Sequence, residues 1–212
     1  YVYNDTLVMG FMATHQPTVW MGDYGYVSVM PQIGDLKLLP KERALSFSHE
    51  DEVSKPHYYS VTMDAGNQKI KGEIASTSRT GFFRFTYPKS DKSHLIIQGI
   101  NITENKKPFQ GYLEVDSEKR EISGYNPERM SSHLGSDLPN FKGYFVIQID
   151  REIKDFGTWN SFRNEPQITV SGTEQKGARM GAYISFNTKK NEQVNVKIGT
   201  SFISVEQARK NL

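Results

Sequence analysis

The chain of 212 residues contains no cysteine. That absence excludes a thiol nucleophile, a disulfide framework and a cysteine-ligated zinc site. No apolar run approaches the ~20 residues that a membrane-spanning helix requires. The 26 basic and 24 acidic residues give a net charge of only +2, and the basic residues are scattered along the chain. We therefore expect no membrane span and no nucleic-acid partner.

Recognisable catalytic motifs are also missing. The five histidines lack a zinc-type spacing such as HExxH, and the chain has neither a GxSxG serine elbow nor a glycine-rich phosphate loop. A sugar hydrolase generally uses two carboxylates across the scissile bond. The pattern puts Asp64, Glu73, Glu114 and Asp116 on exposed-face or turn positions, which do not suit that task.

One acidic run, at positions 50–52 directly after His49, contains three consecutive carboxylates. Oxygen ligands of this kind suit a hard cation such as calcium. The 12-residue EF-hand pattern is absent, so a solvated acidic turn explains the run more simply. By itself the chain is expected to hold no metal and no catalytic residue.

Short alternating runs of apolar and polar residues are abundant, and aromatic residues make up 12% of the chain. In the run FFRFTY, Phe83, Phe85 and Tyr87 share one face, and Phe82, Arg84 and Thr86 share the other. This alternation is typical of half-buried antiparallel strands. Strands are predicted over 58–64, 69–75, 82–87, 144–149, 182–186 and 194–198, and also near 25–30, 94–100, 111–115, 120–124 and 167–172.

Helix signals are nearly absent outside the C-terminal SVEQARKNL, where Ser204 is a candidate N-cap. Many strands and one terminal helix predict an all-β fold, a large antiparallel β-sandwich with a short C-terminal helix. Long polar loops are expected at 34–56, 101–110, 125–142 and 157–166. Since no linker-like composition shift interrupts the chain, we expect a single domain over 1–212.

The segment GFMATHQPTVWMGDYG at 10–25 concentrates polar and aromatic groups between two glycines. Its Pro17 cannot continue a helix or donate to a sheet ladder, so the segment is predicted to be a shaped loop. An indole beside hydrogen-bonding groups suits a sugar ring, because the apolar ring face packs on an aromatic and the hydroxyls need donors and acceptors. The alternative is a Trp20 that fills the core, with His15 and Asp23 capping backbone groups.

Five blocks together resemble the N-terminal domain of glycoside hydrolase family 92, the calcium-dependent exo-α-mannosidases. They are GFMATHQPTVWMGDYG (10–25), FSHEDEVSKPHYYSV (47–61), TSRTGFFRFTYPKSD (77–91), GYNPERMSSHLGSDLPNFKGYFV (124–146) and GAYISFNTKKNEQVNVKIGTSFISVEQARKNL (181–212). The blocks keep the family's order and run through essentially the entire chain. No single block is decisive, but the combination is specific.

The resemblance implies a supersandwich of the galactose-mutarotase-like type, here without its first strand or strands and without the C-terminal catalytic (α/α) barrel. It implies a parent enzyme, an α-mannosidase with a preference for α-1,2 linkages, that hydrolyses terminal mannose from mannans or N-glycans with inversion. Calcium and both catalytic carboxylates would belong to the barrel. The partners implied are a mannose-containing oligosaccharide and that barrel, and the expected location is periplasmic or secreted.

Residue by residue, the resemblance carries over the first block. Trp20 takes the role of an aromatic wall beside the sugar, His15 and Gln16 are its hydrogen-bonding neighbours, and Asp23 is expected to brace the loop. Arg129, with Asn126 in the NPER loop, is a weaker candidate for the cleft. Two readings stay open beside the enzyme: a stand-alone carbohydrate-binding β-sandwich, and a scaffold domain that touches no sugar.

Overall fold

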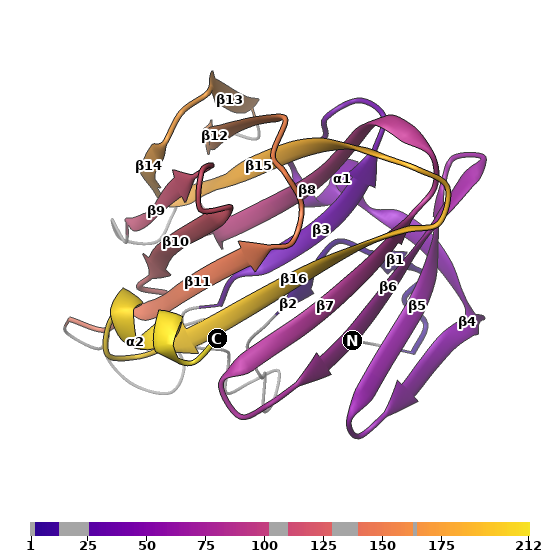
Figure 1. The fold of residues 1–212 in the computed structure, drawn as a ribbon, viewed down its shortest axis with the longest axis horizontal. Coiled ribbons are helices and arrows are strands. Elements are labelled where there is room, and N and C mark those ends of the chain that lie inside the picture. The colour runs from indigo at the N-terminus through magenta and orange to yellow at the C-terminus, as the bar shows by residue number, and fades with distance from the viewer. Residues whose placement is uncertain (1–2, 13–25, 102–109, 129–139, 163–164) are drawn as a thin grey trace.

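The computed structural model describes residues 3–12, 26–101, 110–128, 140–162 and 165–212. In them the chain forms two stacked antiparallel sheets, as Figure 1 shows, which confirms the predicted all-β sandwich. The larger sheet has the order β1 (Leu7–Val8), β4 (Leu45–Lys55), β5 (Tyr58–Ala65), β6 (Gln68–Ser76), β7 (Thr80–Tyr87), β16 (Glu192–Ser201), β11 (Gly143–Ile149), β10 (Glu121–Asn126), β9 (Gly111–Asp116) and β14 (Glu174–Gly177).

The smaller sheet has the order β13 (Glu165–Val170), β12 (Asp155–Phe162), β15 (Arg179–Thr188), β8 (Ser90–Asn101), β3 (Ser28–Ile33) and β2 (Phe11–Met12). Two short helices accompany the sheets in the described residues, α1 (Pro40–Arg43) and α2 (Val205–Lys210). Neither has the length and apolar character that crossing a membrane would take.

The alternation in the sequence sets which side chains enter the core. In β7, Phe83, Phe85 and Tyr87 are buried, while the residues between them are partly exposed. Strand β15 departs from this pattern, because Tyr183 and Ser185 are buried as well as Ala182 and Ile184. Most of β15 is therefore covered on both faces, which period-two alternation alone does not indicate.

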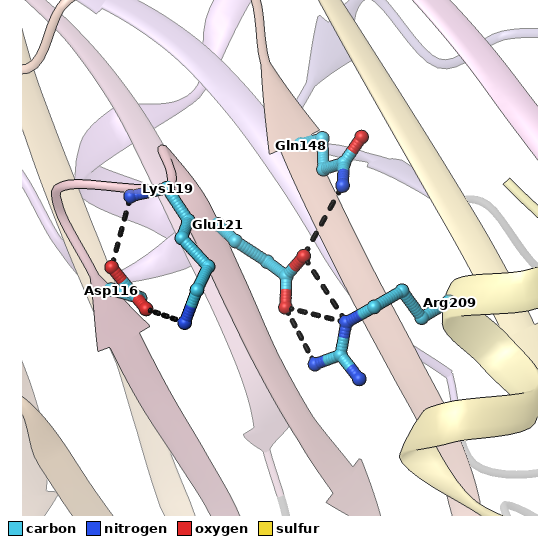
Figure 2. Close-up of polar contacts among 5 residues, drawn as sticks. All are labelled: Asp116, Lys119, Glu121, Gln148 and Arg209. Atoms are coloured by element: carbon cyan, nitrogen blue, oxygen red, sulfur yellow. Dashed lines mark hydrogen bonds and ion pairs between the residues drawn. The ribbon is translucent and has the colours of Figure 1, made fainter.

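Helix α2 begins where the sequence predicts, since the Ser204 side chain accepts a hydrogen bond from the Gln207 backbone N–H. It docks on the outer face of the larger sheet through Arg209, whose Nη2 lies 2.7 Å from Glu121 Oε1 of β10 (Figure 2). Gln148 of β11 donates a further hydrogen bond of 3.2 Å to Glu121 Oε2. The hydrogen bonds to Glu121 raise the pKa of Arg209, and this charged pair joins α2 to β10.

The loop predicted at 34–56 is wrong, because it contains both α1 and the long strand β4. Residues 48–51 interrupt the β4–β5 register. Phe47 pairs with Met63 and Glu52 pairs with Val61, so four residues of β4 lie opposite a single residue of β5. This irregularity and the mostly exposed, polar side chains of β4 hide the strand from any alternation pattern.

The loop predicted at 157–166 is also wrong, because β12 and the start of β13 occupy it. Strand β13 confirms the strand predicted near 167–172, but it begins earlier, at Glu165. Its first residues are exposed and include Pro166, as edge strands often do, so they look like part of a loop. In β12, a Cβ on Gly157 would lie 2.7 Å from Tyr183 Oη of the neighbouring strand. Gly157 therefore allows a close contact between neighbouring strands, and it does not form a turn.

Candidate functional site

The β2–β3 connection holds most of the predicted sugar-contacting residues. The two strand ends that it joins are paired with each other in the smaller sheet. Met12, the last residue of β2, pairs with Ser28 at the start of β3. Phe11 anchors β2 across the sandwich, with its ring centroid 5.5 Å from that of Phe85 in β7. A Cβ on Gly72 would lie 2.8 Å from the Phe11 ring, so this glycine makes the room that the ring occupies.

A second connection, between β10 and β11, starts beside the first. Asn126 ends β10 and is fully buried, and its Nδ2 donates a hydrogen bond of 2.9 Å to the Tyr26 carbonyl oxygen. Its Oδ1 accepts a hydrogen bond of 2.8 Å from the Glu128 backbone N–H, which forms an Asx turn at Asn126–Pro127. Asn126 therefore braces two connections and does not face a cleft. We call this end of the sandwich the loop end.

Arg43 of α1 stabilises the loop end from inside, with only 3% of its surface exposed. Its Nε and Nη1 each donate a 2.8 Å hydrogen bond, to the carbonyl oxygens of Met9 and Leu38. Its Nη2 donates to Gln98 Oε1 at 2.6 Å, and Gln98 pairs with Ser28 at the start of β3. Burial lowers the pKa of Arg43 to about 10, so the guanidinium stays charged at neutral pH.

The structure thus shows how the described residues that flank the predicted site segments come together. His15, Gln16, Trp20 and Asp23 belong to the β2–β3 connection and Arg129 to the β10–β11 connection. These five residues lie outside the described residues, so their side chains stay predictions. The hydrogen bond between Asn126 and Tyr26 nevertheless puts the roots of both connections side by side.

Sequence reasoning missed Arg43. In the sequence it stands in a polar stretch, LPKERALS, where it looks like an ordinary surface residue. Its acceptors Met9 and Gln98 are 34 and 55 positions away, so nothing in the local pattern marks it. The one available signal is Pro40 at the first turn of a short helix, which predicts a helix start but no buried cation.

Apolar side chains are exposed at the same end, just before α2. Phe202 and Ile203 are 66% and 74% exposed, and the Phe202 ring lies 5.5 Å from that of Phe141, which precedes β11. Strand pairing puts them near the loop end, because Tyr144 pairs with Ser201 and Gly143 pairs with Asn126. We call Phe141, Phe202 and Ile203 the apolar cluster; it presents exposed hydrophobic side chains near the two connections.

The acidic run at 50–52 lies within β4, and the carboxylates of Asp51 and Glu52 have protein partners. Asp51 Oδ2 is 3.1 Å from Lys69 Nζ, and Glu52 accepts a 2.6 Å hydrogen bond from the Tyr59 hydroxyl. A bond from His49 also reaches Glu52 and raises the pKa of His49. In the described part of the chain, no group of three or more histidine and acidic side chains could hold a metal ion. The run does not fit a calcium site.

Comparison with known proteins identifies this architecture. A sequence profile described as the glycosyl hydrolase family 92 N-terminal domain matches residues 1–201. The chain belongs to glycoside hydrolase family 92. It is the N-terminal domain of that family, as the resemblance predicted.

Solved structures of family 92 superpose on this domain over its full length. An inverting mannosidase of Bacteroides thetaiotaomicron is 30% identical, with a TM-score of 0.84, and the match covers 100% of this chain and 26% of the other. A family 92 α-mannosidase of the same bacterium is 27% identical, with a TM-score of 0.76, and the coverage is 100% and 28%. None of the curated proteins compared with the chain matches it. The family 92 domain thus spans about a quarter of the length of these enzymes.

Proposed function

We propose that this chain is the sugar-contacting domain of an α-mannosidase, and that its loop end forms one wall of a pocket for a terminal mannose. Trp20 provides the aromatic wall, His15 and Gln16 hydrogen-bond the sugar hydroxyls, and Asp23 braces the loop. Arg129 enters the same pocket from the β10–β11 connection. The substrates are mannans or N-glycans, with an α-1,2 linkage preferred.

The observation that carries this proposal is the bond from Asn126 to Tyr26. It joins two connections that start in different sheets, and both carry residues with the polar and aromatic character that sugar binding requires. Membership of family 92 and the mannosidase activity named for two similar structures supply the substrate class.

Catalysis is assigned to a second domain in the same protein. In this proposal a C-terminal helical barrel packs on the apolar cluster of Phe141, Phe202 and Ile203, next to the loop end. It supplies two carboxylates, an acid and a base, whose carboxyl groups lie roughly 6.5–9.5 Å apart in an inverting enzyme so that water fits between the base and the sugar. It also supplies the calcium ligands, since the described residues of this domain do not fit such a site. The whole enzyme is proposed to be periplasmic or secreted.

The test uses the full-length protein and the isolated 212-residue chain side by side on α-1,2-, α-1,3- and α-1,6-linked mannobiose. The full-length protein is expected to release mannose, first as the β-anomer in a proton NMR time course, fastest from the α-1,2 linkage. A calcium chelator should abolish the reaction.

The isolated chain is expected to release no mannose, because loss of each acid or base step typically costs about 10²–10⁴-fold in rate. Hydrolysis by the isolated chain, or an α-anomer as the first product of the full protein, would contradict the proposal. Binding of mannobiose without hydrolysis by the full-length protein would instead support a carbohydrate-binding sandwich.

A further inference from the structure

A hollow on the outer face of the larger sheet is lined by four lysines. Its volume is about 470 Å³, and Lys69, Lys71, Lys89 and Lys190 contribute to its wall, together with Thr62 and Thr86. The residues that line it include no aspartate or glutamate. A volume of this size falls in the range of small-molecule sites, about 300–1,000 Å³.

Strand pairing explains why these side chains share one face. Thr62 of β5 pairs with Lys71 of β6, which pairs in turn with Thr86 of β7, so the three side chains form a row across the sheet. Lys69 stands two positions from Lys71 and points to the same face. The turns after β7 and before β16 add Lys89 and Lys190 at the end of that row.

The charges of these lysines are only partly balanced. Lys69 Nζ lies 3.1 Å from Asp51 Oδ2 and 3.8 Å from Asp64 Oδ1, and Lys71 Nζ lies 3.2 Å from Glu73 Oε1. Among the described residues, no carboxylate forms an ion pair with Lys89 or Lys190. Two ammonium groups and two threonine hydroxyls therefore remain to contact a ligand in the hollow.

We propose that this hollow binds a tetrahedral oxyanion, a phosphate or sulfate group. Lysine binds phosphate as a point charge, and several ammonium groups around one hollow can contact different oxygens of a tetrahedral group. The volume exceeds that of a bare oxyanion and leaves room for a sugar residue that carries the group. The same chemistry can thus come from the free ion or from a charged sugar.

This oxyanion site is separate from the loop end. Strand β7 pairs with β16 from Thr80 and Gly199 at one end to Tyr87 and Glu192 at the other. The hollow lies at the Tyr87 end, whereas Ser201 and the loop end lie at the Thr80 end. Seven residue steps at about 3.3 Å each separate the two ends by roughly 23 Å. The site does not depend on the proposed mannosidase activity.

Calorimetric titration of the full-length protein with sodium phosphate, sodium sulfate, glucose 6-phosphate and glucose tests the proposal. We expect saturable binding of the oxyanions and of glucose 6-phosphate, and none of uncharged glucose. A tighter complex with glucose 6-phosphate than with phosphate would identify a charged sugar as the ligand, and equal affinities would identify the free ion. Binding should weaken when the salt concentration is raised.

The decisive variant is Lys89→Gln/Lys190→Gln, which removes the two uncompensated charges from exposed turn positions. It should raise the dissociation constant about tenfold or more, since two charge contacts are lost. The control Lys197→Gln removes an exposed lysine of β16 that does not line the hollow, and it should change the constant less than about twofold. No saturable binding, or equal weakening by the control and by the double variant, would overturn the proposal.

Discussion

The interior of the sandwich and its loop end are stabilised by different interactions, apolar burial in the first and hydrogen bonds between buried polar groups in the second. The interior is packed with apolar side chains such as Phe83, Phe85 and Ile198, whose burial follows from alternation along their strands. The loop end depends on Arg43, Gln98 and Asn126, which are buried although they are polar or charged, and which bond groups far away in the sequence. Non-directional burial builds the scaffold, and directional hydrogen bonds position the segments proposed to contact sugar.

The largest expected effect of a single substitution lies in the interior. Phe186 is 2% exposed and packs edge-on against Tyr87 with ring centroids 5.4 Å apart. Phe186→Ala should lower the free energy of unfolding by about 3–5 kcal/mol, because it leaves a cavity. Denaturant unfolding measures this loss. Val170→Ala, at a site 75% exposed, is the control and should change stability by less than about 0.5 kcal/mol.

Arg43 tests whether the loop end depends on polar contacts. Arg43→Met keeps much of the side-chain volume but leaves the carbonyls of Met9 and Leu38 without their donor. The free energy of unfolding should fall by about 1–3 kcal/mol, because buried carbonyl groups are left without a hydrogen-bond donor. In the full-length enzyme, kcat/KM should also fall at temperatures where the variant is fully folded, because β2 loses its support.

Arg84→Met is the matched control for that experiment. Arg84 is a partly exposed arginine of β7 with one side-chain hydrogen bond, to Asn195, so its loss should have little effect on either measurement. If both variants behaved alike, the contrast between interior and loop end would lose its main support.

Much of the fold could be predicted from the sequence, because alternation depends only on neighbouring residues. Strand β7 and the Ser204 N-cap are confirmed as predicted. Strands β4 and β12 were missed, since a register irregularity and a glycine in close contact each erase the alternation. The strand predicted near 167–172 is confirmed as β13, but its start at Glu165 and Pro166 was predicted as loop. At the candidate site, the connections could be identified from residue types, but the partners of Arg43 and Asn126 depend on tertiary contacts that no local pattern contains.

A smaller effect is expected from His94, a buried polar group within the smaller sheet. Its Nε2 donates to the Gly34 carbonyl oxygen at 2.9 Å, so in the neutral ring Nδ1 accepts from the Ser185 hydroxyl at 2.8 Å. Burial lowers the pKa of His94 below its ordinary value. The unfolded chain therefore takes up a proton below about pH 6.5 that the folded chain resists, and stability falls as the pH decreases from there to the folded pKa.

The loss assigned to His94 is at most about 1.4 kcal/mol per pH unit. Chemical denaturation at pH 5, 6, 7 and 8 should show a smaller loss of unfolding free energy toward low pH for His94→Gln than for the unaltered chain. Identical losses in the two proteins would contradict the assignment.

His49→Gln should have the opposite pH dependence, because the hydrogen bond to Glu52 raises the pKa of His49. The stabilisation from His49 is present below about pH 6.5 and is lost as the pH rises through the folded pKa.

Trp20→Ala in the full-length enzyme tests most directly whether the loop end contacts sugar. If Trp20 is the aromatic wall, kcat/KM for an α-mannoside should fall by an amount equivalent to about 1–3 kcal/mol, and the free energy of unfolding should change little. A loss of about 3–5 kcal/mol in stability, with kcat/KM of the folded protein unchanged, would show that Trp20 is a core residue and contradict the proposed function of the loop end.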